Sequence, residues 1–246
     1  MLQMSSSPMA AALPAQPRRR APRLAGDARR AQIVAAACTF FADNGFSGPT
    51  RDLAASIGVT QALLYRYFDR KTDLIDAVFA EVFRDHWAEG AIETLKSTAN
   101  LPMVERTSAV YEGMVSRMTC TATRLLFRAG LDNYPGPIFA SANRCWPIWT
   151  AMLDEWRREE GLPSLAKRPM LEGERALMLS FHNAMVMIRV REHVFHAQRV
   201  LSDAEEIRQV AETHDAGIRE VLHKLHDVGA QDARSLPAAD ETQAAA

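Results

Sequence analysis

The sequence predicts an all-α protein, in which a small three-helix unit near the amino terminus precedes a larger helical body. Apolar residues recur at helical spacing along most of the 246 residues, and no stretch shows the period-two alternation of a half-buried strand. A glycine-centred helix–turn–helix pattern occupies residues 50–71. The three-helix unit is basic and the body acidic, so the two parts also differ in charge.

The first helix is expected from Asp27 to Asn44. The carboxylate of Asp27 suits a helix amino terminus, and Gly45 can take the left-handed conformation that ends a helix. Phe46 is expected to complete the small core beneath it. The apolar face that recurs at helical spacing consists of Ile33, Val34, Ala37, Phe40 and Phe41.

The second and third helices are expected over 50–57 and 60–67, with a tight turn between them. Gly58 in this turn can adopt a positive φ without a steric penalty. Ala54, four residues earlier, is small enough to let the two helices cross closely. The pattern therefore predicts a helix–turn–helix with a largely polar outer face on its second helix.

Four segments of this region together resemble the DNA-binding domain of the TetR family of transcriptional regulators. They are Thr50-Arg51-Asp52-Leu53-Ala54, Gly58-Val59-Thr60, Leu64-Tyr65-Arg66-Tyr67-Phe68 and Lys71-Thr72-Asp73-Leu74. With the preceding helix, the resemblance covers about residues 28–80 and leaves most of the chain without an assignable motif. It implies that the chain binds double-stranded operator DNA.

The resemblance also implies which side chains contact DNA, and the chemistry of those side chains allows it. The start of the second helix offers N–H groups and a cation to phosphates, and the front of the third helix is placed for reading bases. The expected DNA contacts are Thr50, Arg51, Thr60, Gln61, Ala62, Leu63, Tyr65, Arg66, Tyr67 and Lys71.

Three alternatives stay open in this region. One of the two tyrosines can pack inward, and Arg66 can pair with Asp69 instead of DNA. Arg70 replaces the small polar residue that the family has before its lysine, which leaves Asp69 as the candidate cap for the fourth helix.

The charge distribution supports a DNA-binding amino-terminal part. Between Arg18 and Lys71 there are ten basic and four acidic residues, so this part carries +6 and the remainder carries −7. Residues 1–26 are too poor in large apolar side chains to fold. Their arginine cluster at 18–23 either keeps the arm solvated or contributes to DNA affinity along phosphates or in the minor groove.

A fourth helix is expected from 69–71 to about Thr94, and in proteins of this resemblance it transmits the state of the body to the DNA-binding unit. Further helices are expected at 100–119, 122–132, 138–160, 172–196 and 202–227. We therefore divide the chain into a disordered basic arm (1–26), a helix–turn–helix domain (27–71), a ligand-binding and dimerisation domain (72–228) and a disordered tail (229–246).

Methionine and aromatic side chains concentrate in the body, a composition that suits either a pocket for an apolar ligand or an ordinary core. The candidate ligand contacts are Met118, Phe127, Arg128, Trp146, Trp149, Met178, His182 and Met185. His182 can equally be a hydrogen-bonded core histidine. Arg124, Arg128 and Asp132 share one helix face, where they either line the pocket or form surface ion pairs.

The last two long helices carry apolar stripes that predict a four-helix dimer interface. The candidate dimer contacts are Met187, Val194, Ile207, Val210, His214, Ile218, Val221 and Leu225. A twofold dimer would place two DNA-binding units on a palindromic operator. The alternative is that both stripes fill the core of a single chain.

The remaining features argue against other classes of protein. The three cysteines form neither a disulfide framework nor a zinc pattern, and no catalytic or phosphate-binding motif is present. We expect no enzyme activity, metal, cofactor or membrane span, and a cytoplasmic location. The sequence thus predicts a homodimeric repressor released by a small apolar or amphipathic effector. The alternatives are an activator, a regulator with a protein effector, and a helical small-molecule-binding protein that does not bind DNA.

Overall fold

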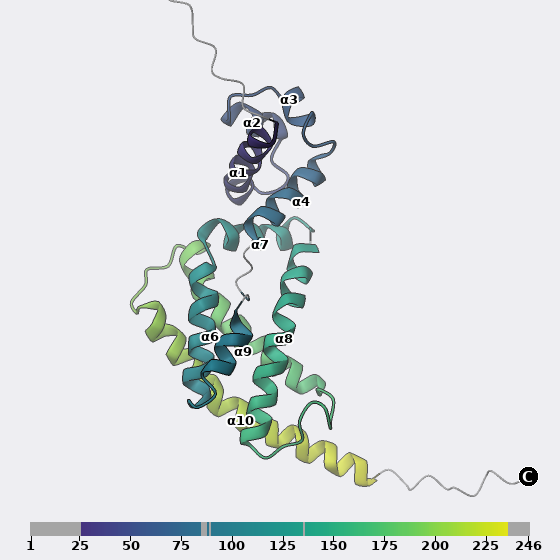
Figure 1. The fold of residues 1–246 in the computed structure, drawn as a ribbon, viewed down its shortest axis with the longest axis vertical. Helices are drawn as coiled ribbons and strands as arrows, with labels where there is room; N and C mark the ends of the chain where they lie inside the picture. The colour runs from purple at the N-terminus through teal and green to yellow at the C-terminus, as the bar shows by residue number, and fades with distance from the viewer. Residues whose placement is uncertain (1–25, 85–87, 89, 135, 236–246) are drawn as a thin grey trace, which may run out of the picture.

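The computed structural model describes residues 26–84, 88, 90–134 and 136–235, and these residues form helices and loops without a strand (Figure 1). The all-α prediction is therefore confirmed. The helices are α1 (Gly26–Asn44), α2 (Thr50–Ser56), α3 (Gln61–Tyr65), α4 (Lys71–Val82), α5 (Ala91–Ser97), α6 (Met103–Arg117), α7 (Cys120–Leu131), α8 (Gly136–Glu159), α9 (Glu172–His193) and α10 (Asp203–Ser235). The predicted arm, including its arginine cluster, and residues 236–246 of the predicted tail lie outside the described residues.

The first four helices form a small unit, the head, at one end of the molecule (Figure 1). α1 ends where predicted, with Gly45 at φ +74°, and Gly58 makes the turn after α2 at φ +67°. Thr60 starts α3, because its Oγ1 accepts a hydrogen bond of 3.1 Å from the N–H of Leu63. The predicted helix–turn–helix is therefore present.

The fourth helix is shorter than we predicted. α4 ends at Val82, and a new helix, α5, begins at Ala91 after Gly90 at φ +77°, so the prediction of one helix to about Thr94 was wrong. Gly90 directly precedes α5 in a left-handed conformation that a helix interior excludes, so α4 and α5 do not form one continuous helix. The predicted cap was also wrong: Asp73, not Asp69, accepts a 2.9 Å hydrogen bond from the N–H of Arg70.

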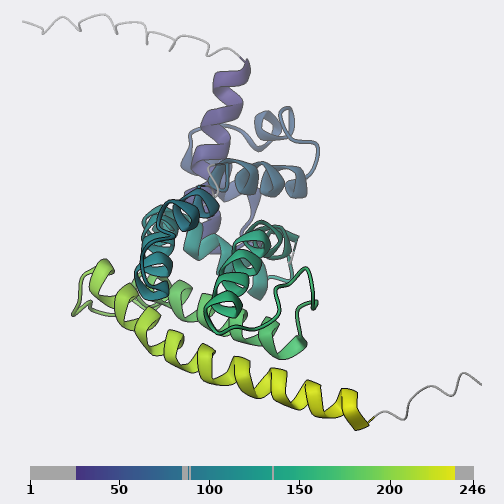
Figure 2. The ribbon, with the colours of Figure 1, turned by 60° about the horizontal axis from the view of Figure 1, so that its bottom comes forward.

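Helices α5 to α10 form the body. α10 packs along α6 and α9 and crosses the base of the molecule as a long helix (Figure 2). It continues to Ser235, so residues 229–235 are helical and the predicted end of the helix at 227 was wrong. Within the described residues, no helix is long and apolar enough to span a membrane.

α7 lies directly between the head and the rest of the body (Figure 1). Leu125 and Ala129 on one face of α7 are fully buried in the head core, together with Phe41 of α1 and Phe79 of α4. The head core is thus built from five helices, of which α7 comes from the body.

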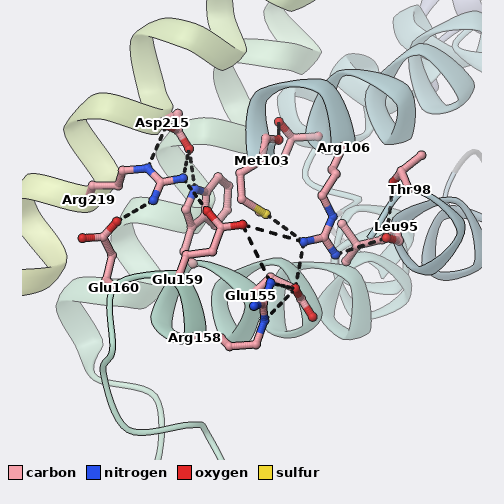
Figure 3. A network of polar contacts seen from close by, with 12 residues as sticks. Leu95, Thr98, Met103, Arg106, Glu155, Arg158, Glu159, Glu160, Asp215 and Arg219 are labelled. Atoms are coloured by element: carbon pink, nitrogen blue, oxygen red, sulfur yellow. Dashed lines mark hydrogen bonds and ion pairs between the residues drawn. The ribbon is translucent and has the colours of Figure 1, made fainter. Parts of the chain in front are cut away.

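A dense set of ion pairs holds the end of the body farther from the head (Figure 3). Arg106 of α6 donates to Glu155 of α8 over 2.8 Å. Arg219 of α10 donates to Glu159 over 2.7 Å and to Asp215 over 2.8 Å. These contacts tie α6, α8 and α10 to one another.

Candidate DNA-binding and ligand-binding sites

A polar triad, of which Thr50 is the buried member, links α3 to α2. The Thr50 hydroxyl accepts a hydrogen bond of 2.9 Å from the Gln61 side-chain amide and lies 3.2 Å from the Tyr65 hydroxyl. Thr50 is only 5% exposed, so its hydroxyl serves this internal contact. Before DNA arrives, the amide of Gln61 is already held in place by a residue of the neighbouring helix.

The other predicted DNA contacts on α2 and α3 differ in exposure. Arg51, Ala62 and Arg66 are exposed, whereas Leu63 is half-buried. Tyr67 is half-buried against the head core, so it is the tyrosine of the pair that packs inward. Arg66 makes no ion pair with Asp69 within the described part of the chain, which leaves its guanidinium available.

Lys71 lies at the start of α4, where it bridges two parts of the head. Its ammonium donates a 2.7 Å hydrogen bond to the carbonyl oxygen of Gly48 and lies 5.9 Å from the centre of the Phe41 ring. The lysine therefore positions the loop before α2 in addition to any contact with DNA.

An apolar pocket of about 460 Å³ opens in the body between α7, α8 and α9. Three of the candidate ligand contacts, Phe127, Trp149 and His182, line it. The pocket falls in the size range of small-molecule sites, about 300 to 1,000 Å³. Its full lining is Leu126, Phe127, Gly130, Leu131, Ser141, Ala142, Trp149, Leu179, His182, Asn183 and Val186.

The remaining candidate ligand contacts lie outside this lining. Met178 and Met185 are buried in the body core, and Met118 lines a separate small crevice beside α4. Trp146 stacks under the guanidinium of Arg175, whose Cζ is 4.9 Å from the ring centre. Helical spacing placed these side chains on the correct helices, but it does not distinguish the wall of a cavity from the adjoining core.

Polar groups in the pocket wall are few. Nδ1 of His182 lies 3.3 Å from the Tyr111 hydroxyl, and the His182 ring is 4.8 Å from the Trp149 ring. Burial raises the pKa of Tyr111, so its hydroxyl keeps its proton at neutral pH. His182 is therefore a hydrogen-bonded histidine at the edge of the core, and its ring also faces the pocket.

The opposite face of α7 holds the head through polar contacts. Arg124 pairs with the Asp43 carboxylate over 2.7 Å, and Arg128 donates to the Asp43 carbonyl oxygen over 3.2 Å. Asp132 accepts a 2.6 Å hydrogen bond from the N–H of Phe46. Arg124, Arg128 and Asp132 therefore do not line the pocket, and Arg124–Asp43 is an ion pair at the surface, which was the alternative. Placing Arg128 among the ligand contacts was wrong.

Gly45 allows this close approach of the head and α7. A Cβ atom at Gly45 would lie 2.9 Å from Oδ2 of Asp132. Tyr134, just after α7, adds a further link, since its hydroxyl donates to Asp76 of α4 and its ring packs on Phe46 and Phe79. Head and body therefore meet through α7 and the loop that follows it.

The candidate dimer contacts fall into three groups by exposure. Ile207 and Ile218 are buried in the core of the same chain, against α6 and α9, so placing them at a dimer interface was wrong. Met187 is 41% exposed. The half-buried remainder consists of Val194, Val210, His214, Val221 and Leu225.

Comparison with known families identifies the amino-terminal part. The family model for bacterial regulatory proteins of the tetR family matches residues 33–78, which run from α1 into α4. Residues 33–78 thus form a TetR-family domain. This domain is the part that the chain shares with bacterial regulatory proteins, and it contains the helix–turn–helix formed by α2 and α3.

Solved structures resemble this chain in fold well beyond the head. A TetR-like transcriptional regulator from Rhodococcus sp. RHA1 is 19% identical, with a TM-score of 0.57 over 79% of this chain and 100% of that chain. A protein from Pseudomonas aeruginosa PAO1 assigned as a transcriptional regulator is 17% identical, with a TM-score of 0.57 over 82% of this chain and 95% of that chain. No curated protein gives a significant sequence match.

Proposed function

We propose that this regulator is a homodimeric repressor that binds a palindromic operator and is released by a small apolar or amphipathic effector. The proposal rests on α7, because one face of this helix lines the pocket and another face is part of the head core. Leu126 and Phe127 face the pocket, while Leu125 and Ala129, on the same helix, are buried in the head core. A ligand that displaces the pocket face of α7 therefore moves contacts that belong to the DNA-binding head.

In the proposed DNA complex, α3 enters the major groove. Ala62 and Arg66 are exposed on the outer surface of α3, and Arg51 is exposed at the start of α2. An arginine can bond a guanine edge or a phosphate, and an alanine can contact a thymine methyl group. Gln61, held by Thr50, would present the remaining amide hydrogen and its oxygen to a base.

The proposed dimer forms through the outer faces of α9 and α10. Met187 is exposed on α9, and Val210, His214 and Val221 are only half-buried on α10. A twofold axis through this surface would bring the same residues of a second chain against them. The two heads would then read half-sites separated by about one DNA turn or a multiple of it.

The proposed route of release runs through α7 as well as α4. A ligand that pushes on Leu126, Phe127 or Leu131 would shift the helix whose other face bonds Asp43 and the N–H of Phe46. Coupling energies between such sites are typically about 1 to 3 kcal/mol. That range is sufficient to change operator occupancy several-fold or more.

A gel-shift titration of the purified protein on the promoter of its own gene tests the proposal. We expect tight, salt-sensitive binding that prefers this promoter over random DNA of equal length. Gln61→Ala should reduce the preference, whereas Arg51→Ala should weaken binding. Equal affinity for promoter and random DNA at every salt concentration would contradict the proposal.

A further inference from the structure

We propose that the ligand of the α7–α8–α9 pocket is an electrically neutral molecule with a largely apolar body and one hydrogen-bonding group. The inference rests on the proposed function, since it takes this pocket to be the effector site. It adds the chemical class of the effector, which follows from the charges and polar groups around the cavity.

No carboxylate, ammonium or guanidinium group occurs among the described residues that line the pocket. The imidazole of His182 is the titratable group in that lining, and it is already within reach of the Tyr111 hydroxyl. A charged ligand would therefore enter this cavity without an opposite charge in its wall.

Three cations that lie close to the pocket along the chain are engaged elsewhere. Arg128 donates to the Asp43 carbonyl oxygen of the head. Arg144 donates to the carbonyl oxygen of Phe83 over 3.0 Å. Arg175 stacks on Trp146, so none of these three guanidinium groups is directed to the pocket lining.

Burying an ion without a partner is costly, because the lost hydration is not replaced by the protein. Apolar surface has the opposite preference and gains free energy when it leaves water. The rim of the pocket also carries exposed apolar side chains, since Leu131 is 74% and Leu179 is 38% exposed. An apolar ligand would cover part of this surface, whereas a hydrated ion would gain nothing from it.

Asn183 supplies the polar anchor. It lies on α9 in the pocket wall, it is exposed, and no described residue hydrogen-bonds its side-chain amide. An amide offers both a donor and an acceptor, so it can bind a hydroxyl or a carbonyl group without requiring a charge on the ligand. Phe127 and Trp149 add aromatic faces on which a flat apolar ring can pack.

Two fluorescent probes with the same ring system test the charge preference. N-phenylnaphthylamine is neutral, and anilinonaphthalene sulfonate adds one negative charge. We expect the full-length protein to bind the neutral probe at least about ten-fold more tightly, which corresponds to about 1.4 kcal/mol. If anilinonaphthalene sulfonate binds as tightly as N-phenylnaphthylamine or more tightly, the inference of a neutral ligand is wrong.

Variants locate the bound probe. Ala142→Phe, which fills the pocket, should weaken binding of the neutral probe at least about ten-fold, while the control Ala204→Phe on the exposed side of α10 should leave it unchanged. Asn183→Lys should reverse the selectivity by adding a cation to the wall, so that the sulfonate gains at least about ten-fold relative to the neutral probe. Neutral-probe binding that is insensitive to both pocket variants would also overturn the inference.

The same experiment separates this inference from the proposed function. If the neutral probe binds in the pocket but leaves operator affinity unchanged, the neutral ligand class is supported and the proposal of effector-controlled release is contradicted. If a charged probe binds the pocket more tightly and releases the operator, effector-controlled release is supported and the neutral ligand class is contradicted.

Discussion

The two ends of the body are built from different chemistry. At the end far from the head, guanidinium and carboxylate groups interlock α6, α8, α9 and α10, and Arg157 and Glu174 are both 0% exposed. Next to the head, α7, α8 and α9 instead surround an apolar cavity without charged groups in its described lining. One end is thus fixed by directional bonds, and the proposed function requires the other end to change shape when a ligand enters.

The buried Arg157–Glu174 pair offers the strongest test of the rigid end. Arg157 donates to Glu174 over 2.8 Å and also to the carbonyl oxygens of Pro163 and Arg168. Arg157→Ala leaves the buried Glu174 carboxylate without its cationic partner. The free energy of unfolding, measured by urea denaturation, should fall by about 3 to 5 kcal/mol. The neighbouring Arg158, whose side chain is 61% exposed, is the matched control, and Arg158→Ala should cost less than about 1 kcal/mol. Similar losses in both variants would remove the distinction between the two ends.

Acid should weaken the ion-paired end. Burial alone would raise the pKa of Glu174, but the hydrogen bonds from Arg157 hold it below the usual value. For Glu160, bonds from His223 and Arg219 lower the pKa. A carboxylate with a lowered folded-state pKa contributes stability that is complete above the unfolded value of about 4.3 and is lost as pH falls through the folded value.

We therefore expect the melting temperature to fall steeply as pH decreases below about 4.3. The Glu160→Gln variant should show a shallower dependence, because it lacks one of the titrating groups. Between pH 7 and 5 the melting temperature should change little through these two groups, because both carboxylates stay ionised there. A melting temperature independent of pH across this range and below would contradict the assignment.

The junction between α7 and the head should contribute a smaller amount. Asp132→Ala removes the acceptor of the 2.6 Å bond from the Phe46 N–H, and we expect a loss of about 1 to 2 kcal/mol in calorimetric unfolding. Asp227, exposed on α10, is the control, and Asp227→Ala should change stability by less than about 0.5 kcal/mol. No loss in the Asp132 variant would mean that α7 does not hold the head.

The triad in the head should show the smallest effect. Thr50→Val keeps the shape of the side chain but removes the hydroxyl that bonds Gln61 and approaches Tyr65, and it should cost about 1 kcal/mol of stability. In a double-mutant cycle with Gln61→Ala, the two changes should be non-additive by at least about 0.5 kcal/mol. Additive losses would show that the two side chains do not act together.

The head could be predicted from sequence because its signals are local. Gly45 and Gly58 end α1 and α2 with positive φ, and Thr60 caps α3, each within a few residues of the element that it bounds. The end of α4 at Val82 was missed, because the apolar spacing continues to Phe83 and gives no local signal for a stop. Local pattern gives the helices, but tertiary packing fixes where some of them end.

The body could be predicted only as a set of helices. Arg124, Arg128 and Asp132 share a helix face, yet the sequence does not reveal that this face meets Asp43 and Phe46, which are far away along the chain. Likewise, Ile207 and Ile218 belong to an apolar stripe that suits either a dimer or a core. Which neighbour covers each face depends on the placement of whole helices, and no local spacing encodes it.

The coupling of pocket and head through α7 is tested most directly by operator affinity with and without N-phenylnaphthylamine. In the wild-type protein, we expect the neutral probe to weaken binding to its own promoter at least about five-fold. In the Asp132→Ala variant, probe affinity should stay the same but the weakening should fall below about two-fold. An unchanged ratio in this variant, or no weakening in the wild type, would contradict transmission through α7.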